Sequence, residues 1–204
     1  MKALRYIAIG FTLVAAGCTT MSDQEVSDKA VAVMKASFNE RGQAKLDRLD
    51  QDDAQRLCSI APTTTLAKDV AARIEKANFD AIRYPADGKL LGNWREGEKV
   101  AQTGTGMQYS DDPKRPAGAN CYACHQLTKQ EISFGTIGPS LYQFAKIRGN
   151  SEAMQRYAYG KIYNSQAFTA CSNMPRFGHK RILTEQQIKD LTALLMDPDS
   201  PVNK

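Results

Sequence analysis

The apolar positions of the chain recur at helical spacing along most of its length. Three amphipathic helices are predicted in the first part, over 22–38, over 43–58 and after a cap formed by Thr63 to Thr65. Their apolar stripes are narrow and many charges face outward, so these helices should pack on another surface instead of forming a core alone. We therefore expect residues 19–84 to be a helical N-terminal extension.

The second part of the chain, residues 85–204, follows the turn Tyr84-Pro85-Ala86-Asp87-Gly88. It carries broader apolar faces and predicts a domain with its own core. Four helices are predicted there, over 89–104, over 140–147, over 151–163 and from the capping box of Thr184 and Gln187 to Pro198.

The one long apolar stretch lies at the start of the chain. Lys2 and Arg5 supply positive charge, an apolar run follows, and small residues precede Cys18. This pattern is typical of a secretory signal over 1–18, too short for a permanent membrane helix. Cys18 also resembles a lipoprotein box, with Ala15 where Leu is usual, so lipidation at Cys18 and ordinary cleavage nearby both stay open. The expected location is the periplasm.

The charge of the chain is mildly positive, at a formal +5. No dense basic run with interleaved aromatic residues occurs, so nucleic-acid binding is not expected. A basic rim could steer an acidic protein partner, although a solvated surface of mixed charge is the simpler explanation.

The strongest chemical signal is Cys121-Tyr122-Ala123-Cys124-His125, because Cys-x-x-Cys-His is the attachment sequence of c-type haem. On a helical turn Cys121 and Cys124 share one face and can reach the two vinyl groups of one porphyrin. His125 would then face the iron, and Asn120 is expected to cap the turn. A zinc site would need a second ligand pair, and a thioredoxin-like site a βαβ pattern; neither is found.

Two further cysteines, Cys58 and Cys171, would be exposed to an oxidising compartment, where such thiols most often pair. We expect a Cys58–Cys171 disulfide that joins the extension to the second part of the chain. Closing so long a loop would contribute on the order of 4 kcal/mol in the chain-entropy model. An intermolecular bridge is the alternative.

Two later segments bear on the iron. In Gly135-Thr136-Ile137-Gly138-Pro139-Ser140-Leu141, a backbone carbonyl could accept a hydrogen bond from His125 Nδ1, although a plain turn explains the segment equally well. In the loop around Met174, the soft thioether is the candidate for the second axial ligand. His179 and Lys180 are the competing ligands.

The order of these features resembles the class I cytochrome c fold, an all-α fold. The haem motif, the segment 135–141, Ile162-Tyr163-Asn164 and Met174-Pro175-Arg176-Phe177-Gly178 together resemble the SoxX family, over residues 85–204. Members of this family are the smaller cytochrome subunits of the SoxAX complexes of bacterial sulfur oxidation. The extension lies outside the minimal SoxX domain.

The resemblance implies one covalently bound haem c with His125 and Met174 as iron ligands. It also implies a SoxA-like partner subunit, a SoxYZ-like carrier protein that receives thiosulfate on a cysteine, and a small acceptor cytochrome. The chain would be a non-catalytic, electron-accepting subunit of an L-cysteine S-thiosulfotransferase complex. A stand-alone periplasmic cytochrome c is the alternative function, and an open sixth iron position would instead indicate a sensor haem protein.

Overall fold

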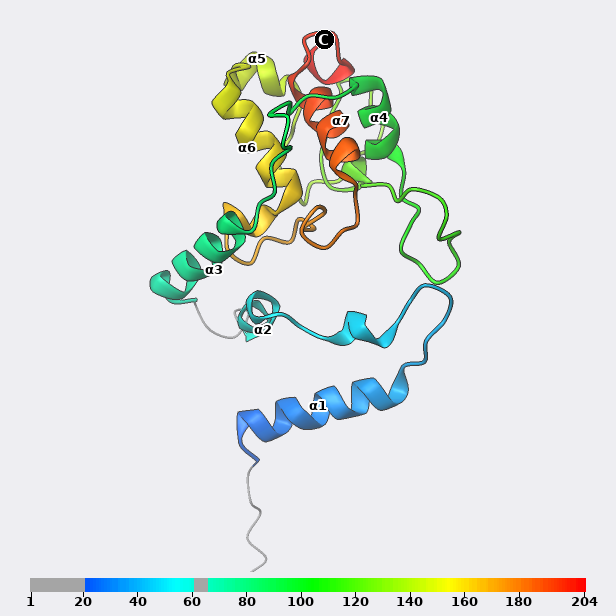
Figure 1. Ribbon diagram of the computed structural model, residues 1–204, viewed down its shortest axis with the longest axis vertical. Coiled ribbons are helices and arrows are strands. Elements are labelled where there is room, and N and C mark those ends of the chain that lie inside the picture. The colour runs from blue at the N-terminus through cyan, green and yellow to red at the C-terminus, as the bar shows by residue number, and fades with distance from the viewer. Residues whose placement is uncertain (1–20, 61–65) are drawn as a thin grey trace, which may run out of the picture. The chain divides into compact units, whose positions relative to one another are not determined.

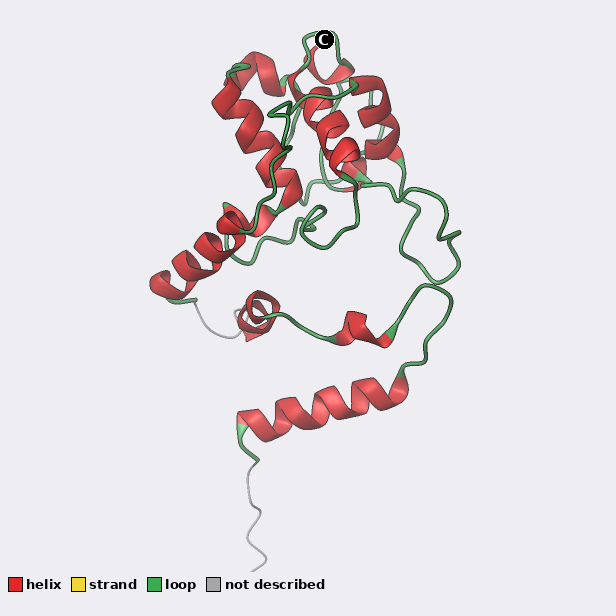
Figure 2. Ribbon diagram, in the orientation of Figure 1, coloured by secondary structure: helices red, strands yellow, loops and turns green. Residues whose placement is uncertain are grey.

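The computed structural model describes residues 21–60 and 66–204, and the regular structure in these ranges is helical, as the all-α prediction expects (Figure 2). The chain divides into two compact units, one ending at Phe38 and one spanning 39–204. The α-helices are α1 (Asp23–Ser37), α2 (Asp53–Ile60), α3 (Lys68–Asp80), α4 (Trp94–Gln102), α5 (Phe144–Arg148), α6 (Glu152–Tyr163) and α7 (Glu185–Met196). The 3₁₀ turns are η1 (Leu46–Leu49), η2 (Cys121–Ala123), η3 (Ser165–Ala167) and η4 (Pro201–Asn203).

Helix α1 confirms the first predicted helix almost to the residue. Ser22 and Glu25 form a capping box, in which each side chain accepts from the other residue's backbone N–H. The apolar side chains of Val26 and Val33 are exposed. Helix α1 therefore owes its start to local capping, whereas its apolar stripe buries no residue within the unit.

The predicted helix over 43–58 is wrong as one element, because the chain forms η1 and then α2. Asp52 explains the break. Its carboxylate accepts from the backbone N–H of Gln55 at 2.9 Å, and the Gln55 side chain accepts from the N–H of Asp52 at 3.0 Å. This reciprocal cap starts a new helix at Asp53, so a helix cannot run through the position.

The third predicted helix is present as α3, but its start differs from the expected cap. The helix begins at Lys68 with Ala67 as its N-cap and no capping side chain. Thr63 to Thr65 lie outside the described residues. Ile74 and Asn78 are the buried residues of α3, and α3 packs on η3. Residues 39–84 belong to the same compact unit as 85–204, and the division of the chain at residue 84 stays a prediction.

Helix α7 is the centre of the larger unit and packs against both α4 and α6 (Figure 1). The predicted capping box of Thr184 and Gln187 is confirmed at its start. Where α4 crosses α7, a Cβ on Gly97 would lie 2.1 Å from the backbone oxygen of Asp190, so only glycine allows this close approach. The side chains buried in this core include Leu90, Ala101, Leu127, Tyr159, Ile188, Leu191, Leu194, Met196 and Val202.

Helix α4 is shorter than the predicted helix over 89–104, because the residues before it are bound to α7. Gly92 N–H donates to the Lys189 carbonyl at 3.0 Å, and Asn93 N–H donates to the Asp190 carboxylate at 2.8 Å. The Asn93 side chain then caps the helix. Tertiary hydrogen bonds thus replace the first helical turn.

The predicted helices over 140–147 and 151–163 are present as α5 and α6. Helix α5 starts later than expected, because Leu141 N–H donates to the Gln126 carbonyl and Gln143 adopts a left-handed conformation. Among the described helices, none is long and apolar enough to cross a membrane.

Candidate haem-binding site

The motif Cys121 to His125 folds as a single tight turn, which follows α4 after a loop over 103–120. Ala119 N–H and Asn120 N–H donate to the carbonyls of Val100 and Thr103, which ties this segment to the end of α4. Cys124 N–H and His125 N–H both donate to the Cys121 carbonyl, at 3.1 and 2.9 Å. The two cysteines and the histidine therefore leave one short turn together.

The expected cap by Asn120 is wrong. Its side chain makes no capping hydrogen bond, and its backbone lies in the left-handed region with φ of 47°. The chain must turn sharply here, because the preceding residues are bonded to α4 while the next ones enter η2. Asparagine adopts the left-handed conformation more readily than most residues, so Asn120 serves the turn through its backbone.

The segment 135–141 runs alongside the motif and fixes His125. Gly138 N–H donates to the Cys124 carbonyl at 2.8 Å. His125 Nδ1 lies 2.7 Å from the Pro139 carbonyl oxygen, which confirms the expected acceptor. A carbonyl can only accept, so Nδ1 is the donor in this hydrogen bond, which leaves Nε2 as the ring nitrogen that could bind a metal.

Gly138 shows how closely this segment approaches the histidine. A Cβ at this position would lie 2.1 Å from Cε1 of the His125 ring, far inside van der Waals contact. Only glycine leaves room for the imidazole beside the backbone. The glycine of the Gly-Pro pair is therefore a steric requirement of the site.

The motif opens onto a cavity of about 630 Å³. Cys121, Cys124 and His125 line it, together with Met174 from a distant part of the chain. Most other lining side chains are apolar, and they include Leu127, Leu141, Phe144, Ile162, Phe177, Leu191 and Leu194. An apolar cavity of this size with two free thiols and one imidazole fits a haem, which is a large apolar disc with two vinyl groups and a central iron.

Met174 is held on a loop that joins η3 to α7. Its carbonyl accepts from Ser165 Oγ at 2.5 Å, and its N–H donates to Ser172 Oγ at 3.3 Å. Among the described methionines, Met174 alone lines the cavity, whereas the competing ligands His179 and Lys180 do not line it. The geometry therefore favours Met174 over both competitors.

Cys58 and Cys171 form a disulfide, with sulfur atoms 2.07 Å apart. The bond joins α2 to the loop that carries Met174. Cys171 lies three residues before Met174 in this loop. The alternative, an intermolecular bridge, would need a free thiol at Cys58 or Cys171, and both sulfur atoms are used in this bond. Cys18, the expected lipidation site, lies outside the described residues.

Two cations at the cavity were not identified from the sequence. Arg148 and Lys161 line it, and either can pair with a carboxylate of a bound haem. Lys161 Nζ donates to the Ser165 carbonyl and to Thr169 Oγ1, at 3.3 and 3.2 Å. Burial lowers the pKa of Lys161, and Glu75 opposes this shift. The sequence signal for Lys161 was its helical spacing. It lies three residues after buried Ala158, so both residues lie on the same face of α6.

The alternative sites gain no support from the described part of the chain. No group of three or more His, Cys, Asp and Glu side chains there could hold a metal ion, as a zinc site would require. Burial raises the pKa of the Cys121 thiol to about 12, whereas a thioredoxin-like pair needs an acidic thiol.

Comparison with known proteins agrees with this site. The family model for cytochrome c matches residues 110–197, which include the motif and the Met174 loop. The chain is also 38% identical over 161 residues to an uncharacterized lipoprotein of Aquifex aeolicus (strain VF5), covering 76% of this chain and 73% of that protein. The all-α, class I cytochrome c fold is thereby confirmed. The chain therefore carries a cytochrome c domain, the domain of electron-transfer proteins with covalently bound haem c.

Proposed function

We propose that the protein is a monohaem electron carrier whose haem is held by Cys121, Cys124, His125 and Met174. The cavity that these four side chains line together carries the proposal. Cys121 and Cys124 would anchor the ring through thioether bonds, and His125 Nε2 and the Met174 sulfur would be the axial ligands. Haem iron supplies a one-electron couple between its ferrous and ferric states. With both axial positions filled by protein, electron transfer is favoured over the binding of small ligands.

Absorption spectra of the oxidised and reduced protein test this ligand set. We expect a c-type reduced spectrum and the weak near-infrared band of an iron–methionine sulfur bond. Covalent haem without that band would make His179 the leading ligand. Carbon monoxide binding to the reduced protein would show an open sixth position and favour a sensor function. Protein that accumulates without haem would overturn the proposal.

We further propose that the carrier works as a SoxX-type subunit beside a SoxA-like cytochrome. The support is the sequence resemblance in the two segments that meet at the cavity, 135–141 and 174–178. In this role the haem accepts electrons released when a SoxA-like subunit joins thiosulfate to a cysteine of a SoxYZ-like carrier. A small acceptor cytochrome then takes the electrons onward.

Reduction of the haem by thiosulfate distinguishes this role from a stand-alone carrier. We expect reduction only when the SoxA-like subunit and the SoxYZ-like carrier are both present, followed by reoxidation by a small cytochrome. Sulfate, which carries no sulfane sulfur, is the matched control. Absence of thiosulfate-dependent reduction in the complete mixture would favour the stand-alone carrier.

We also propose that the mature protein lies in the periplasm and is anchored to a membrane by lipid on Cys18. A relative described as a lipoprotein supports this anchor. An intact mass that includes acyl chains, and release into the soluble fraction by Cys18→Ser, are expected. A mature chain that starts after Cys18 without lipid would contradict the anchor.

A further inference from the structure

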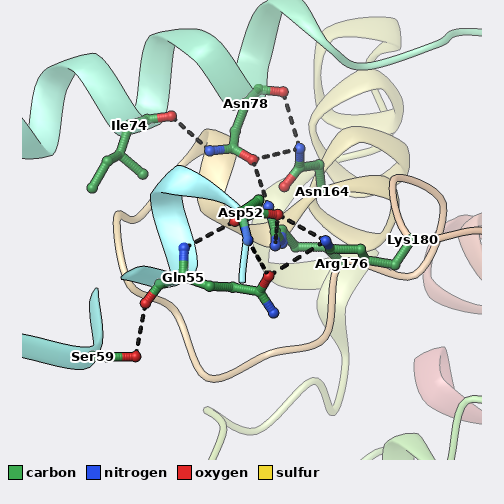
Figure 3. A network of polar contacts seen from close by, with 8 residues as sticks. All are labelled: Asp52, Gln55, Ser59, Ile74, Asn78, Asn164, Arg176 and Lys180. Atoms are coloured by element: carbon green, nitrogen blue, oxygen red, sulfur yellow. Dashed lines mark hydrogen bonds and ion pairs between the residues drawn. The ribbon is translucent and has the colours of Figure 1, made fainter. Parts of the chain in front are cut away.

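The loop that carries Met174 is held by residues 52–78, far away in sequence. The disulfide from Cys58 binds the loop before Met174, and Ala170 N–H next to it donates to the Glu75 carboxylate at 3.0 Å. After Met174, ion pairs and hydrogen bonds reach the same segment (Figure 3). The loop is thus braced on both sides of the proposed ligand.

Arg176 is the main attachment point after Met174. Its side chain is only 6% exposed, so its charge must be paired inside the protein. Nη2 lies 2.6 Å from the Asp52 carboxylate, and Nη1 donates to Asn78 Oδ1 at 3.3 Å. A buried guanidinium with these two partners has little freedom to move, and Met174 is two residues away.

Asp52 joins two residues of the loop to the cap of α2. The same carboxylate oxygen that pairs with Arg176 lies 2.8 Å from Lys180 Nζ, while the other oxygen accepts from Gln55 N–H. Partial burial raises the pKa of Asp52, but hydrogen bonds from Lys180, Gln55 and Arg176 outweigh this and lower it to about 2. The carboxylate is therefore charged at any pH near neutral.

Asn78 aims its carbonyl oxygen at the loop. Its Nδ2 donates to the Ile74 carbonyl at 2.8 Å, which leaves Oδ1 to accept from Arg176 and from Asn164 Nδ2 (Figure 3). Asn164 directly follows α6. Asn78 thus connects α3, the end of α6 and the Met174 loop through one oriented amide.

The loop itself has little other local structure at the ligand. No helix includes Met174, and its own backbone bonds are to two serine hydroxyls, Ser165 and Ser172. A thioether is neutral and binds iron weakly, so ligation depends on how well the loop is held in place.

We propose that Asp52 and Asn78 are positioning residues for Met174, which act through Arg176 to keep the Met174 sulfur at the haem iron. The inference rests on the proposed function, in which Met174 is an axial ligand. It assigns a task to residues 52–78, which lie outside the part of the chain that the cytochrome c model matches. Neither residue lines the cavity, so both act at a distance from the iron.

The test is Asp52→Asn in the haem-loaded protein, with Asp53→Asn as the matched control. Both changes remove one negative charge at the start of α2, but among the described residues Asp53 forms an ion pair only with exposed Arg56, at 3.4 Å. Asp52→Asn removes the charged partner of Arg176, and hydrogen bonds to charged groups are stronger than neutral ones. We therefore expect the rate of imidazole binding to ferric iron to rise about tenfold to hundredfold in this variant. The iron–sulfur band should weaken and the reduction potential should fall, whereas Asp53→Asn should match the parent.

A second variant and a second readout separate positioning from general instability. Asn78→Leu removes the amide at similar size and should change the same spectral band and potential. Hydrogen exchange of residues 170–180 should speed up in both variants while covalent haem content stays at the parental level. A parental band, potential and exchange rate in both folded variants would overturn the inference alone. A parent protein without the iron–sulfur band would overturn the proposed ligand and this inference together.

Discussion

The two sides of the cavity are built in different ways. His125 is positioned by neighbours in the chain, since its anchor Cys121 is one turn away and its Pro139 partner lies within the adjacent segment. Met174 is positioned by side chains such as Asp52, which is 124 residues from Arg176. The histidine side therefore depends on backbone geometry and glycine, whereas the methionine side depends on buried charge and a disulfide.

This difference matters for how each side would fail. Backbone hydrogen bonds in a short turn are present whenever the turn forms, so the His125 side is robust to changes elsewhere. The Met174 side requires residues 39–84 to be folded onto the rest of the unit. Conditions that loosen that segment should release the methionine before they affect the histidine.

The largest expected effect comes from the double substitution Cys121→Ala and Cys124→Ala. It removes both thioether bonds, so haem should be lost on acid extraction or the protein should be degraded. Intact mass with and without extraction measures the attachment. Cys121→Ala alone should leave weakly attached haem. Normal covalent holoprotein from the double variant would contradict the assignment.

Met174→Ala tests the distant side directly. Loss of the thioether should remove the iron–sulfur band, lower the reduction potential and let carbon monoxide bind the reduced protein. Met154→Ala is the control, because Met154 packs on the core and does not line the cavity. Equal spectra for the two variants would move the ligand to His179 or Lys180.

Replacement of Cys58 and Cys171 by serine tests the covalent part of the brace. Loss of a disulfide that closes so long a loop should lower the free energy of unfolding by about 2–5 kcal/mol. Chemical denaturation measures this change, with covalent haem content as the control. The iron–sulfur band should weaken, whereas spectral features that depend on His125 should change less. An unchanged band would show that the ion pairs hold the Met174 loop in place without the disulfide.

Gly138→Ala tests the local side. The new Cβ would collide with the His125 ring, and overpacking of this kind costs about 1–3 kcal/mol of stability. Denaturation curves measure it, and a displaced imidazole should also alter the haem spectrum. Gly104→Ala is the control, because the nearest atom to a Cβ there would be Nδ2 of the Asn120 side chain, at 3.3 Å. Identical behaviour of both variants would remove the steric argument.

The smallest effect is expected on acidification. The pKa of Asp52 is about 2 in the folded protein, below its ordinary value of 3.8. A lowered carboxylate pKa stabilises the folded state above the ordinary value, and this stabilisation is lost as the pH falls toward 2. The difference in unfolding free energy between the parent and Asp52→Asn should therefore persist down to about pH 4 and shrink below it. A difference that vanishes near neutral pH would contradict the ion pairs.

Sequence reasoning identified the short-range features because each depends on a few adjacent residues. The Cys-x-x-Cys-His turn and the capping box at Thr184 are of this kind. For the segment 135–141 the sequence left a plain turn and a carbonyl acceptor equally open, and the structure decided between them. The break at Asp52 leaves no mark in the periodicity, because the apolar stripe over 43–58 continues through it and a capping carboxylate is, in the sequence, one outward-facing charge among many. The residue types of Asp52, Asn78 and Arg176 gave no sign that they would meet.

The amino-acid sequence by itself determined the covalent motif and the cytochrome c domain, since these rest on local spacing. The tertiary structure decided that the Pro139 carbonyl lies at His125 Nδ1 and that only glycine fits at 138. Only the tertiary structure decided which residues surround Met174. A buried guanidinium must find partners wherever the folded chain brings them, and Arg176 finds Asp52 and Asn78 because α2 and α3 pack beside the loop. Such pairings follow from three-dimensional packing and leave no periodic signal along the chain.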